Sequence, residues 1–512
     1  MSAPPGAGLG GAGHQAFVQQ HRGRPGMVYV GANDGMLHGF SSLDGRERLA
    51  YVPQGAWPRL RDLTEPAYPH RYSVDGGLMS GDVFDAGQWK TVLLGTLGRG
   101  GPGYFVLDVT SPSRLQDQDP AAQVLLDRSD GLDPDIGHQI LEPSLDPALP
   151  ARVMQITRLN NGRWAALMGN GVNSRNERPV LLIQYLDGDR ALLKLPVGSV
   201  AHPLAEASGN GLSNPLPIDF NGDGKVDVVY AGDQLGQLWK FDLSAPSAQG
   251  WQQAAPDRPI FVAEDAQGRR QPITAAPVWL PHPYGGVMLG FGTGRLLTPG
   301  DRRHAGVQTL YGLWDPARVG VGGAQVQVGP GTPLGAGWRR RLPAPLVAQH
   351  RTESLRQGEQ MLYRSSRHKV DYRGPVAVRG WYMDLPESQE RVLANGMVLG
   401  RLWLQRSLVP AYSDPSQADA PACEAPLREA VGSEYVLDLF SGAPTVWPVF
   451  DTDGVGLTGT TLTDVSGWRA DAPSRLWMRT AGNQVLSVGR GASMRLRVMG
   501  GPSARIGWRQ LQ

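Results

Sequence analysis

A unit made of a strand, a glycine-containing turn and a second strand recurs along the chain, and it constrains the fold more than any other feature. One copy spans residues 27–40 and reads Met-Val-Tyr-Val-Gly-Ala-Asn-Asp-Gly-Met-Leu-His-Gly-Phe. An altered copy spans residues 228–242 and reads Val-Val-Tyr-Ala-Gly-Asp-Gln-Leu-Gly-Gln-Leu-Trp-Lys-Phe-Asp. In both copies, β-branched and aromatic residues flank the turn, which predicts two paired strands.

Single halves of this unit return elsewhere in the chain. Opening halves lie at 89–95, 164–171 and 286–294, and closing halves lie at 103–109, 309–315, 380–385 and 434–439. A small twisted sheet cannot bury both of its faces alone, so sheets that recur at intervals of tens of residues must cover one another around an axis. The sequence therefore predicts an all-β fold, a β-propeller of a modified seven-bladed, quinoprotein-like type.

Length and composition agree with many short strands. The chain has 512 residues, more than one simple core usually holds, with 68 Gly and 42 Pro. We expect residues 1–25 to be a flexible Gly/Pro-rich segment and residues 26–512 to form the propeller. A stretch near 320–374, rich in Gly, Arg and Gln, interrupts the rhythm and is expected to be a long irregular insertion.

Charge and cysteine content exclude several classes of protein. The formal net charge is +2, so the overall balance does not call for nucleic acid or a membrane surface. Cys423 is the single cysteine, which excludes an internal disulfide and a cysteine-based zinc cluster. No run of about 18 apolar residues exists, so we expect no transmembrane segment. Residues 1–13 lack a signal-peptide pattern, which leaves a cytoplasmic protein or part of a longer secreted one.

The stretch 219–227 predicts a calcium loop. Calcium takes six to eight oxygen ligands at about 2.3–2.6 Å, and a loop can supply them from positions 1, 3, 5, 7 and 9. Those positions hold Asp219, Asn221, Asp223, the backbone carbonyl of Lys225, and Asp227. The predicted metal ligands are these five residues and the predicted ion is Ca²⁺.

The loop departs from an EF-hand at position 12, where Tyr230 replaces a bidentate Glu. The residues after the loop read as a strand, so the ion is expected in a β context with Asp227 as the closing ligand. Gly224 stands at position 6, where the chain turns sharply. The alternative is a polar turn without metal, because the same residue types favour turns. A dockerin or integrin-type repeat shares the Asn-Gly-Asp-Gly core, but the loop occurs in one full copy.

Other signals of chemistry have simpler interpretations. The Gly-rich stretches 6–11 and 98–103 lack the strand-to-helix context of a dinucleotide site and are expected to be a disordered segment and a turn. His38 lies on an apolar strand and is expected to be a hydrogen-bonded structural residue. The basic run 339–341 is expected to be a solvated loop. We expect no catalytic residues and no enzyme activity.

Several of these motifs together resemble the PilY1 family of type IV pilus biogenesis proteins and tip adhesins. Residues 28–40 are similar to the signature that opens the family's carboxy-terminal propeller, and 218–242 are similar to its calcium loop with the following strand pair. Residues 380–392 and the ending 507–511 also resemble the family. The resemblance covers about residues 24–511, whereas the amino-terminal half of a typical member, with its signal peptide, has no counterpart in this chain.

The resemblance implies a function. Bound calcium would favour extended surface pili, and its loss would permit retraction, so that calcium occupancy regulates twitching motility and surface attachment. The implied partners are minor pilins or a pilus tip complex, with a host surface or an outer-membrane secretin as further candidates. The implied location is extracellular, or associated with the pilus and outer membrane, if the chain belongs to a longer exported protein.

The alternative class is an enzyme, a quinoprotein (PQQ-dependent) dehydrogenase-like propeller. Those enzymes also hold calcium, but they gather its ligands from separate blades, whereas residues 219–227 are contiguous. Many of the alcohol dehydrogenases of this class also place a vicinal cysteine pair over the quinone, which Cys423 alone cannot provide.

Overall fold

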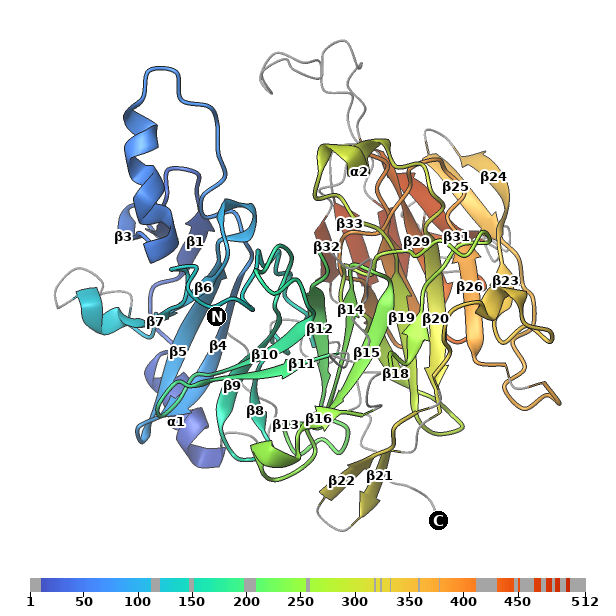
Figure 1. The fold of residues 1–512 in the computed structure, drawn as a ribbon, viewed down its shortest axis with the longest axis horizontal. Coiled ribbons are helices and arrows are strands. Elements are labelled where there is room, and N and C mark those ends of the chain that lie inside the picture. The colour runs from blue at the N-terminus through green and yellow to red at the C-terminus, as the bar shows by residue number, and fades with distance from the viewer. Residues whose placement is uncertain are drawn as a thin grey trace. The chain divides into compact units, whose positions relative to one another are not determined.

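The recurring units form antiparallel sheets in the computed structural model of the chain. The structure describes residues 11–111, 120–146, 152–197, 209–254, 258–316, 319–322, 325–331, 333–357, 360–376, 378–410, 431–445, 450–451, 465–470, 476–480, 484–488 and 494–497. The chain divides into two compact units, the first of Met1–Ile260 with Arg318–Pro333 and the second of Phe261–Ala317 with Leu334–Gln512. Strands dominate both units (Figure 1).

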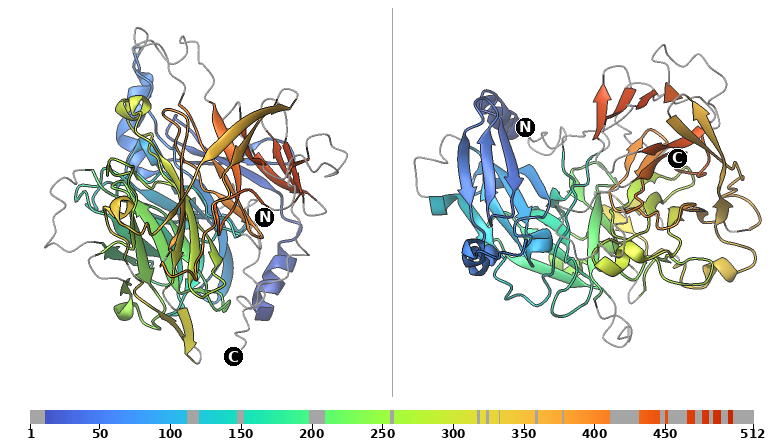
Figure 2. Two further views of the ribbon diagram at one scale, coloured as in Figure 1. Left: turned by 90° about the vertical axis from the view of Figure 1, so that its right-hand side faces the viewer. Right: turned by 90° about the horizontal axis from the view of Figure 1, so that it is seen from above.

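The described residues of the first unit form four sheets of three or more strands that follow one another along the chain, as the colours of Figure 2 show. The first sheet has the order β1-β2-β3 and the second β4-β5-β6-β7. The third has the order β11-β10-β9-β8-β13, and the fourth includes β12-β14-β15-β16. The strand bounds are β1 Met27–Gly31, β2 Leu37–Ser41, β3 Glu47–Tyr51, β4 Leu78–Asp85, β5 Gln88–Thr96, β6 Tyr104–Asp108, β7 Val124–Asp127, β8 Ile156–Leu159, β9 Trp164–Gly169, β10 Val180–Tyr185, β11 Leu192–Pro196, β12 Leu212–Ile218, β13 Lys225–Val226, β14 Val228–Asp233, β15 Gln237–Asp242 and β16 Gln252–Gln253.

The second and third sheets of this unit each bury both faces against their neighbours. Along β5, Leu93 joins a core with the first sheet, whereas Val92 and Leu94 on the opposite face join a core with the third sheet. This alternation is the period of two that a strand imposes on its side chains. A third core fills the space between the third and fourth sheets and includes Leu167, Ile183, Val229, Trp239 and Phe241.

The first unit also contains an α-helix, α1 (Gly11–Gln20), and this corrects the expectation of a flexible segment over residues 1–25. The helix lies beside the ends of β4 and β5 (Figure 1). His14 and Phe17 are buried, and the His14 ring meets Trp89 edge-on at 4.4 Å between centroids. Residues 1–10 lie outside the described part of the chain. The helix is ordered by these tertiary contacts rather than by helix propensity.

The second unit holds three sheets and a short strand, β17 (Phe261–Val262). Their strand orders are β18-β19-β20-β26-β23, β24-β25-β31-β29-β28-β27 and β30-β34-β33-β32. The bounds are β18 Val278–Pro281, β19 Val287–Gly292, β20 Thr309–Asp315, β23 Val347–Gln349, β24 Arg351–Gln357, β25 Gln360–Ser365, β26 Gly380–Asp384, β27 Met397–Leu399, β28 Leu402–Arg406, β29 Gly432–Asp438, β30 Phe450–Asp451, β31 Val465–Ala470, β32 Leu476–Thr480, β33 Gln484–Val488 and β34 Met494–Arg497.

The cores of the second unit repeat the face-to-face packing. Trp381 of β26 and Trp403 of β28 are fully buried and lie 5.9 Å apart between ring centroids, which joins the first two of these sheets. A further core includes Leu362, Leu404, Val436, Trp468 and Leu496. Apart from one two-stranded hairpin, β21 (Val319–Gly322) with β22 (Gln325–Val328), the described residues of the whole chain form seven sheets. That number agrees with the predicted seven blades.

Short helical segments connect the strands. They are α2 Pro299–Arg303 and the 3₁₀ helices η1 Gln54–Thr64, η2 Gly98–Gly100, η4 Pro120–Gln123, η5 Ala248–Gly250 and η6 Trp338–Arg340. In α2, Thr298 and Asp301 form a capping box in which each side chain accepts the other residue's backbone N–H. Such caps stabilise a helix that is too short to be stable on its own propensity.

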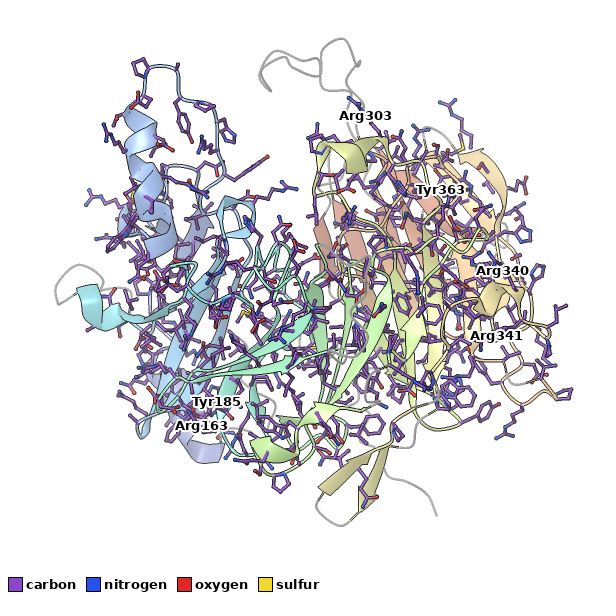
Figure 3. The ribbon with its side chains drawn as sticks, viewed as in Figure 1. Arg163, Tyr185, Arg303, Arg340, Arg341 and Tyr363 are labelled. Atoms are coloured by element: carbon purple, nitrogen blue, oxygen red, sulfur yellow. The ribbon has the colours of Figure 1, made fainter. Side chains whose placement is uncertain are left out.

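The stretch 320–374 is not the irregular insertion that its composition predicts, because β22–β25 and η6 lie within it. The expectation of a solvated basic loop at 339–341 is also wrong for its first residue. Arg339 is largely buried and donates to both carboxylate oxygens of Asp384, at 3.0 and 2.7 Å. Arg340 and Arg341 are exposed (Figure 3). Pairing with Asp384 allows the Arg339 guanidinium to be buried.

Candidate metal centre

The predicted calcium loop connects β12 to β14 in the fourth sheet of the first unit. The two strands pair antiparallel, with Ile218 opposite Val228, so the loop ends are held close together. Within the loop, the short β13 pairs in parallel with β8 of the neighbouring sheet, which places Val226 opposite Leu159. The loop is therefore fixed on both sides by backbone hydrogen bonds.

Asp219 organises the first half of the loop. Its Oδ1 accepts the backbone N–H of Gly222 and its Oδ2 accepts that of Gly224, both at 2.7 Å. Gly222 and Gly224 have φ values of 75° and 85°, in the left-handed region that glycine enters without a steric penalty. The glycines at these positions thus allow the chain to curl around one carboxylate.

The next two side chains repeat the same kind of turn. Asn221 Oδ1 accepts the backbone N–H of Asp223 at 3.0 Å, and Asp223 Oδ1 accepts that of Lys225 at 2.9 Å. Asp223 also pairs with the ammonium of Lys225 at 3.0 Å. Asp223 is exposed, whereas Asn221 and Lys225 are half-buried. The alternating polar residues therefore order the loop through side-chain to backbone bonds.

Asp227 closes the loop from a buried position. Its Oδ2 accepts the backbone N–H of Phe220 at 2.8 Å, and its Oδ1 accepts Asn160 Nδ2 at 3.1 Å. Asn160 follows β8, so this bond reaches the loop from the neighbouring sheet. The same amide nitrogen donates to the carbonyl oxygens of Val226 and Leu243. The sequence did not predict a role for Asn160, because the Asn-Asn-Gly stretch that contains it is typical of an ordinary turn.

Burial and repulsion between carboxylates disfavour the ionised forms of Asp219 and Asp227. Burial, with smaller contributions from the charges of Asp219 and Asp223, raises the pKa of Asp227 to about 7 against the hydrogen bonds from Phe220 and Asn160. Burial also raises the pKa of Asp219, and the charge of Asp223 adds to this effect. A cation among these oxygens would reverse both shifts.

The structure brings the five predicted ligands into one loop but does not close them into a coordination shell. The carboxylate oxygens are engaged by backbone N–H groups and by Lys225. Within the described ranges, no group of three or more acidic, histidine or cysteine side chains converges as metal ligands do. The donor set, which consists only of oxygens, suits a hard cation such as calcium. Calcium binding stays a prediction.

His38 is hydrogen-bonded, as its setting on a strand predicts. Its Nε2 lies 2.9 Å from Asp34 Oδ2 and its Nδ1 lies 2.6 Å from Glu47 Oε1. The hydrogen bond with Glu47 raises the pKa of His38, and Asp34 adds to the shift. The imidazole thus bridges two carboxylates within the first sheet, a structural role.

Comparison with known proteins gives the class of this chain. The model of the PilY1 beta-propeller domain family matches residues 8–336. The described sheets and this match define a β-propeller, which confirms the predicted fold. Among the described residues, no helix is both long enough and apolar enough to cross a membrane.

The chain belongs to the PilY1 β-propeller family. It is 36% identical over 406 residues to the type IV pilus biogenesis factor PilY1 homolog of Xylella fastidiosa, covering 75% of this chain and 25% of that protein. It is 32% identical over 462 residues to type IV pilus biogenesis factor PilY1 of Pseudomonas aeruginosa strain PAO1, covering 86% and 36%. The chain thus spans about a quarter to a third of the length of these relatives.

A solved structure matches the chain over nearly its whole length. The crystal structure of the Pseudomonas aeruginosa PilY1 C-terminal domain matches with a TM-score of 0.74 and 26% identity, and the match covers 96% of this chain and 97% of that one. The predicted family is therefore confirmed. Family membership speaks against the alternative of a quinoprotein dehydrogenase.

Proposed function

We propose that the chain acts as the propeller of a type IV pilus biogenesis protein and adhesin, and that calcium in the loop 219–227 regulates pilus extension, retraction and surface attachment. Support comes from the family and from the names of the curated relatives, which are type IV pilus biogenesis factors. The proposed partners are a pilus tip complex of minor pilins, and a host surface or an outer-membrane secretin. The proposed location is the pilus or the outer surface.

The observation that carries the calcium proposal is the burial of Asp227 in a loop that holds two further carboxylates, those of Asp219 and Asp223. A buried carboxylate with a pKa of about 7 lies near two further carboxylates whose charges raise that pKa. Such an arrangement is costly unless it is protonated or neutralised by a cation. Calcium supplies the neutralising charge and accepts oxygen ligands in flexible geometry.

Calcium binding would be transmitted to the neighbouring sheet. For Asp223 to become a ligand, the ammonium of Lys225 must leave its carboxylate, and Asp227 must keep or exchange its bond with Asn160. Because Asn160 also holds the carbonyl groups of Val226 and Leu243, a change at Asp227 reaches the contact between β13 and β8. The bound ion orders this edge, and the empty loop loosens it.

Calorimetry on matched variants tests the proposal. Asp223→Ala removes an exposed carboxylate whose contacts are the Lys225 backbone N–H and ammonium. Asp371→Ala is the control, because Asp371 makes the same two kinds of contact, to the backbone N–H of Arg373 and the ammonium of Lys369. We expect the parent and Asp371→Ala to bind one calcium ion per chain, and Asp223→Ala to bind at least about tenfold more weakly.

The regulatory part needs an experiment in cells. A strain that carries Asp223→Ala in the full-length protein should retract its pili at calcium concentrations where the parent and the Asp371→Ala strain keep them extended. Twitching zones and surface pilin measure this response. All three strains could behave equally although Asp223→Ala has lost calcium binding. That result would support the ion site and reject its regulatory role.

A further inference from the structure

Two exposed histidines of the second unit lie side by side on adjacent segments. His350 lies between β23 and β24, and His368 follows β25. Their ring centroids are 5.3 Å apart and the ring planes are inclined by 53°. A tilted pair at this separation is within the range of aromatic contacts, and hydrogen bonds to the backbone also hold both residues.

The backbone at both histidines is held by a buried polar cluster. The His350 N–H donates to Ser366 Oγ at 3.0 Å, and the Ser366 N–H donates to the His350 carbonyl at 2.9 Å. The Gln349 side chain, which is buried, accepts the His368 N–H and donates to the His368 carbonyl. Ser366 Oγ completes the cluster by donating to Gln349 Oε1 at 2.6 Å. These hydrogen bonds therefore fix the backbone from which both imidazole rings extend.

One ring nitrogen of His368 has a defined role. Its Nδ1 lies 2.7 Å from the carbonyl oxygen of Ala348, which can only accept a hydrogen bond, so Nδ1 carries the proton. In the neutral imidazole, Nε2 then keeps its lone pair. Histidines that bind metals usually donate their second ring N–H to a carbonyl or carboxylate in this way, which fixes the ring and makes the ligating nitrogen more basic.

The ring separation matches a shared metal ion. A zinc ion lies about 2.1 Å from a ligating imidazole nitrogen and hence about 3.2 Å from the ring centroid, so two imidazoles at a tetrahedral angle have centroids roughly 5.3 Å apart. The observed distance is 5.3 Å. Two of the nearby positive charges are paired with carboxylates, Arg351 with Glu387 and Lys369 with Asp371.

We propose that His350 and His368 form a two-histidine binding site for a borderline transition-metal ion, zinc or copper(II). Imidazole nitrogen suits these ions, whereas calcium prefers oxygen ligands, so the site is chemically distinct from the loop 219–227. In the described residues no set of three or more acidic, histidine or cysteine side chains converges there, so water completes the coordination and the site is open. The ion pins the β23–β24 junction to the segment after β25.

Zinc titration of the chain without an affinity tag tests this site. The titration is followed by calorimetry. Excess calcium in the buffer occupies sites built from oxygen ligands, so that the heat of zinc binding reports imidazole ligands. The parent should bind one zinc ion, and His350→Gln and His368→Gln should each weaken binding by at least about tenfold. His304→Gln is the control, because His304 is another exposed histidine of the same unit. Its affinity should equal that of the parent.

Electron paramagnetic resonance of bound copper(II) gives an independent readout. The parent should show coupling to two imidazole nitrogens, and each single variant should show coupling to one. Ser366→Ala leaves both ligands in place and removes the hydroxyl that holds His350. It should weaken zinc binding less than loss of a ligand does. No zinc binding by the parent, or equal affinity in the His350→Gln and His304→Gln variants, overturns the proposal whether or not the loop binds calcium.

Discussion

Asn160 donates a hydrogen bond from Nδ2 to Oδ1 of Asp227 at 3.1 Å, across two neighbouring sheets of the propeller. Asn160 lies after β8 of the third sheet, and Asp227 lies just before β14 of the fourth. The carboxylate that closes the proposed calcium loop therefore depends on a residue 67 positions away in sequence. This bond couples the proposed ion site to the packing of the sheets.

Asn160→Ala should destabilise the chain and weaken calcium binding. The change leaves the carbonyl groups of Val226 and Leu243 without this donor, and an unsatisfied buried polar group costs about 1–3 kcal/mol. Asn161→Ala is the control, because Asn161 contacts Tyr185 and Arg163 rather than the loop. Urea denaturation and calorimetry measure both effects. If Asn160→Ala and Asn161→Ala bind calcium with equal affinity, calcium binding does not depend on the hydrogen bond between Asn160 and Asp227.

The contribution of Asp227 to the stability of the calcium-free chain should fall as pH rises between about 4 and 7. The pKa of Asp227 is raised from 3.8 to about 7 in the folded chain. In this window the folded chain keeps a proton that the unfolded chain releases, so the free energy of unfolding decreases with pH. Asp227→Asn should flatten part of the slope. The remaining slope combines Asp233, whose pKa burial raises to about 6, with His282, whose pKa burial lowers to about 4 and which therefore acts in the opposite direction.

Urea titrations at several pH values in the presence of a chelator check this dependence. Calcium should reverse the trend near neutral pH, because the ion binds the ionised carboxylate and stabilises the folded chain. A parent and Asp227→Asn with identical slopes would contradict the assignment of the proton to Asp227.

His38 should stabilise the first sheet more in acid than in base. Its hydrogen bond with Glu47 and its contact with Asp34 raise the pKa of the imidazole above 6.5. The stabilisation is fully present below about pH 6.5 and is lost as pH rises through the folded pKa. His38→Gln should therefore lower Tm more at pH 5.5 than at pH 8.5. The effect is modest because Asp34 and Glu47 are exposed. An equal loss at both pH values would assign His38 a packing role alone.

Arg339→Ala should cost about 2–3 kcal/mol of stability, because it leaves Asp384 without its two bonds in a partly buried site. The guanidinium also covers the ring of Tyr382, with 4.3 Å between the guanidinium carbon and the ring centroid. The adjacent Arg340 is exposed, so Arg340→Ala should change the free energy of unfolding by less than about 0.5 kcal/mol. Equal losses for the two variants would contradict the distinction between them.

The repeated strand signals predicted much of the fold because they are local. The closing half at 309–315 coincides with β20, and the second full copy at 228–242 forms the β14–β15 hairpin, with Val228 opposite Asp242. β-Branched and aromatic residues around a glycine-containing turn specify such a hairpin without help from distant residues.

The features that sequence analysis missed depend on tertiary contacts. α1 has no acidic residue in its first turn and no basic residue in its last, and it is held by the burial of His14 and Phe17. Arg339 reads as part of a basic run, but its partner Asp384 is 45 residues away. Asn160 and Asp227, which are in contact, are 67 positions apart in sequence. Composition and periodicity do not contain such pairings.

Anomalous diffraction from crystals grown with calcium shows whether the loop 219–227 binds the ion. We predict one strong anomalous peak in the loop 219–227. The calcium ion should lie about 2.3–2.6 Å from oxygens of Asp219, Asn221, Asp223, Lys225 and Asp227. The same crystals should show the Lys225 ammonium displaced from Asp223. A loop without a peak at saturating calcium, with the Lys225 ammonium still paired with Asp223, would contradict the proposed calcium site. The loop would then be a turn held by its own hydrogen bonds.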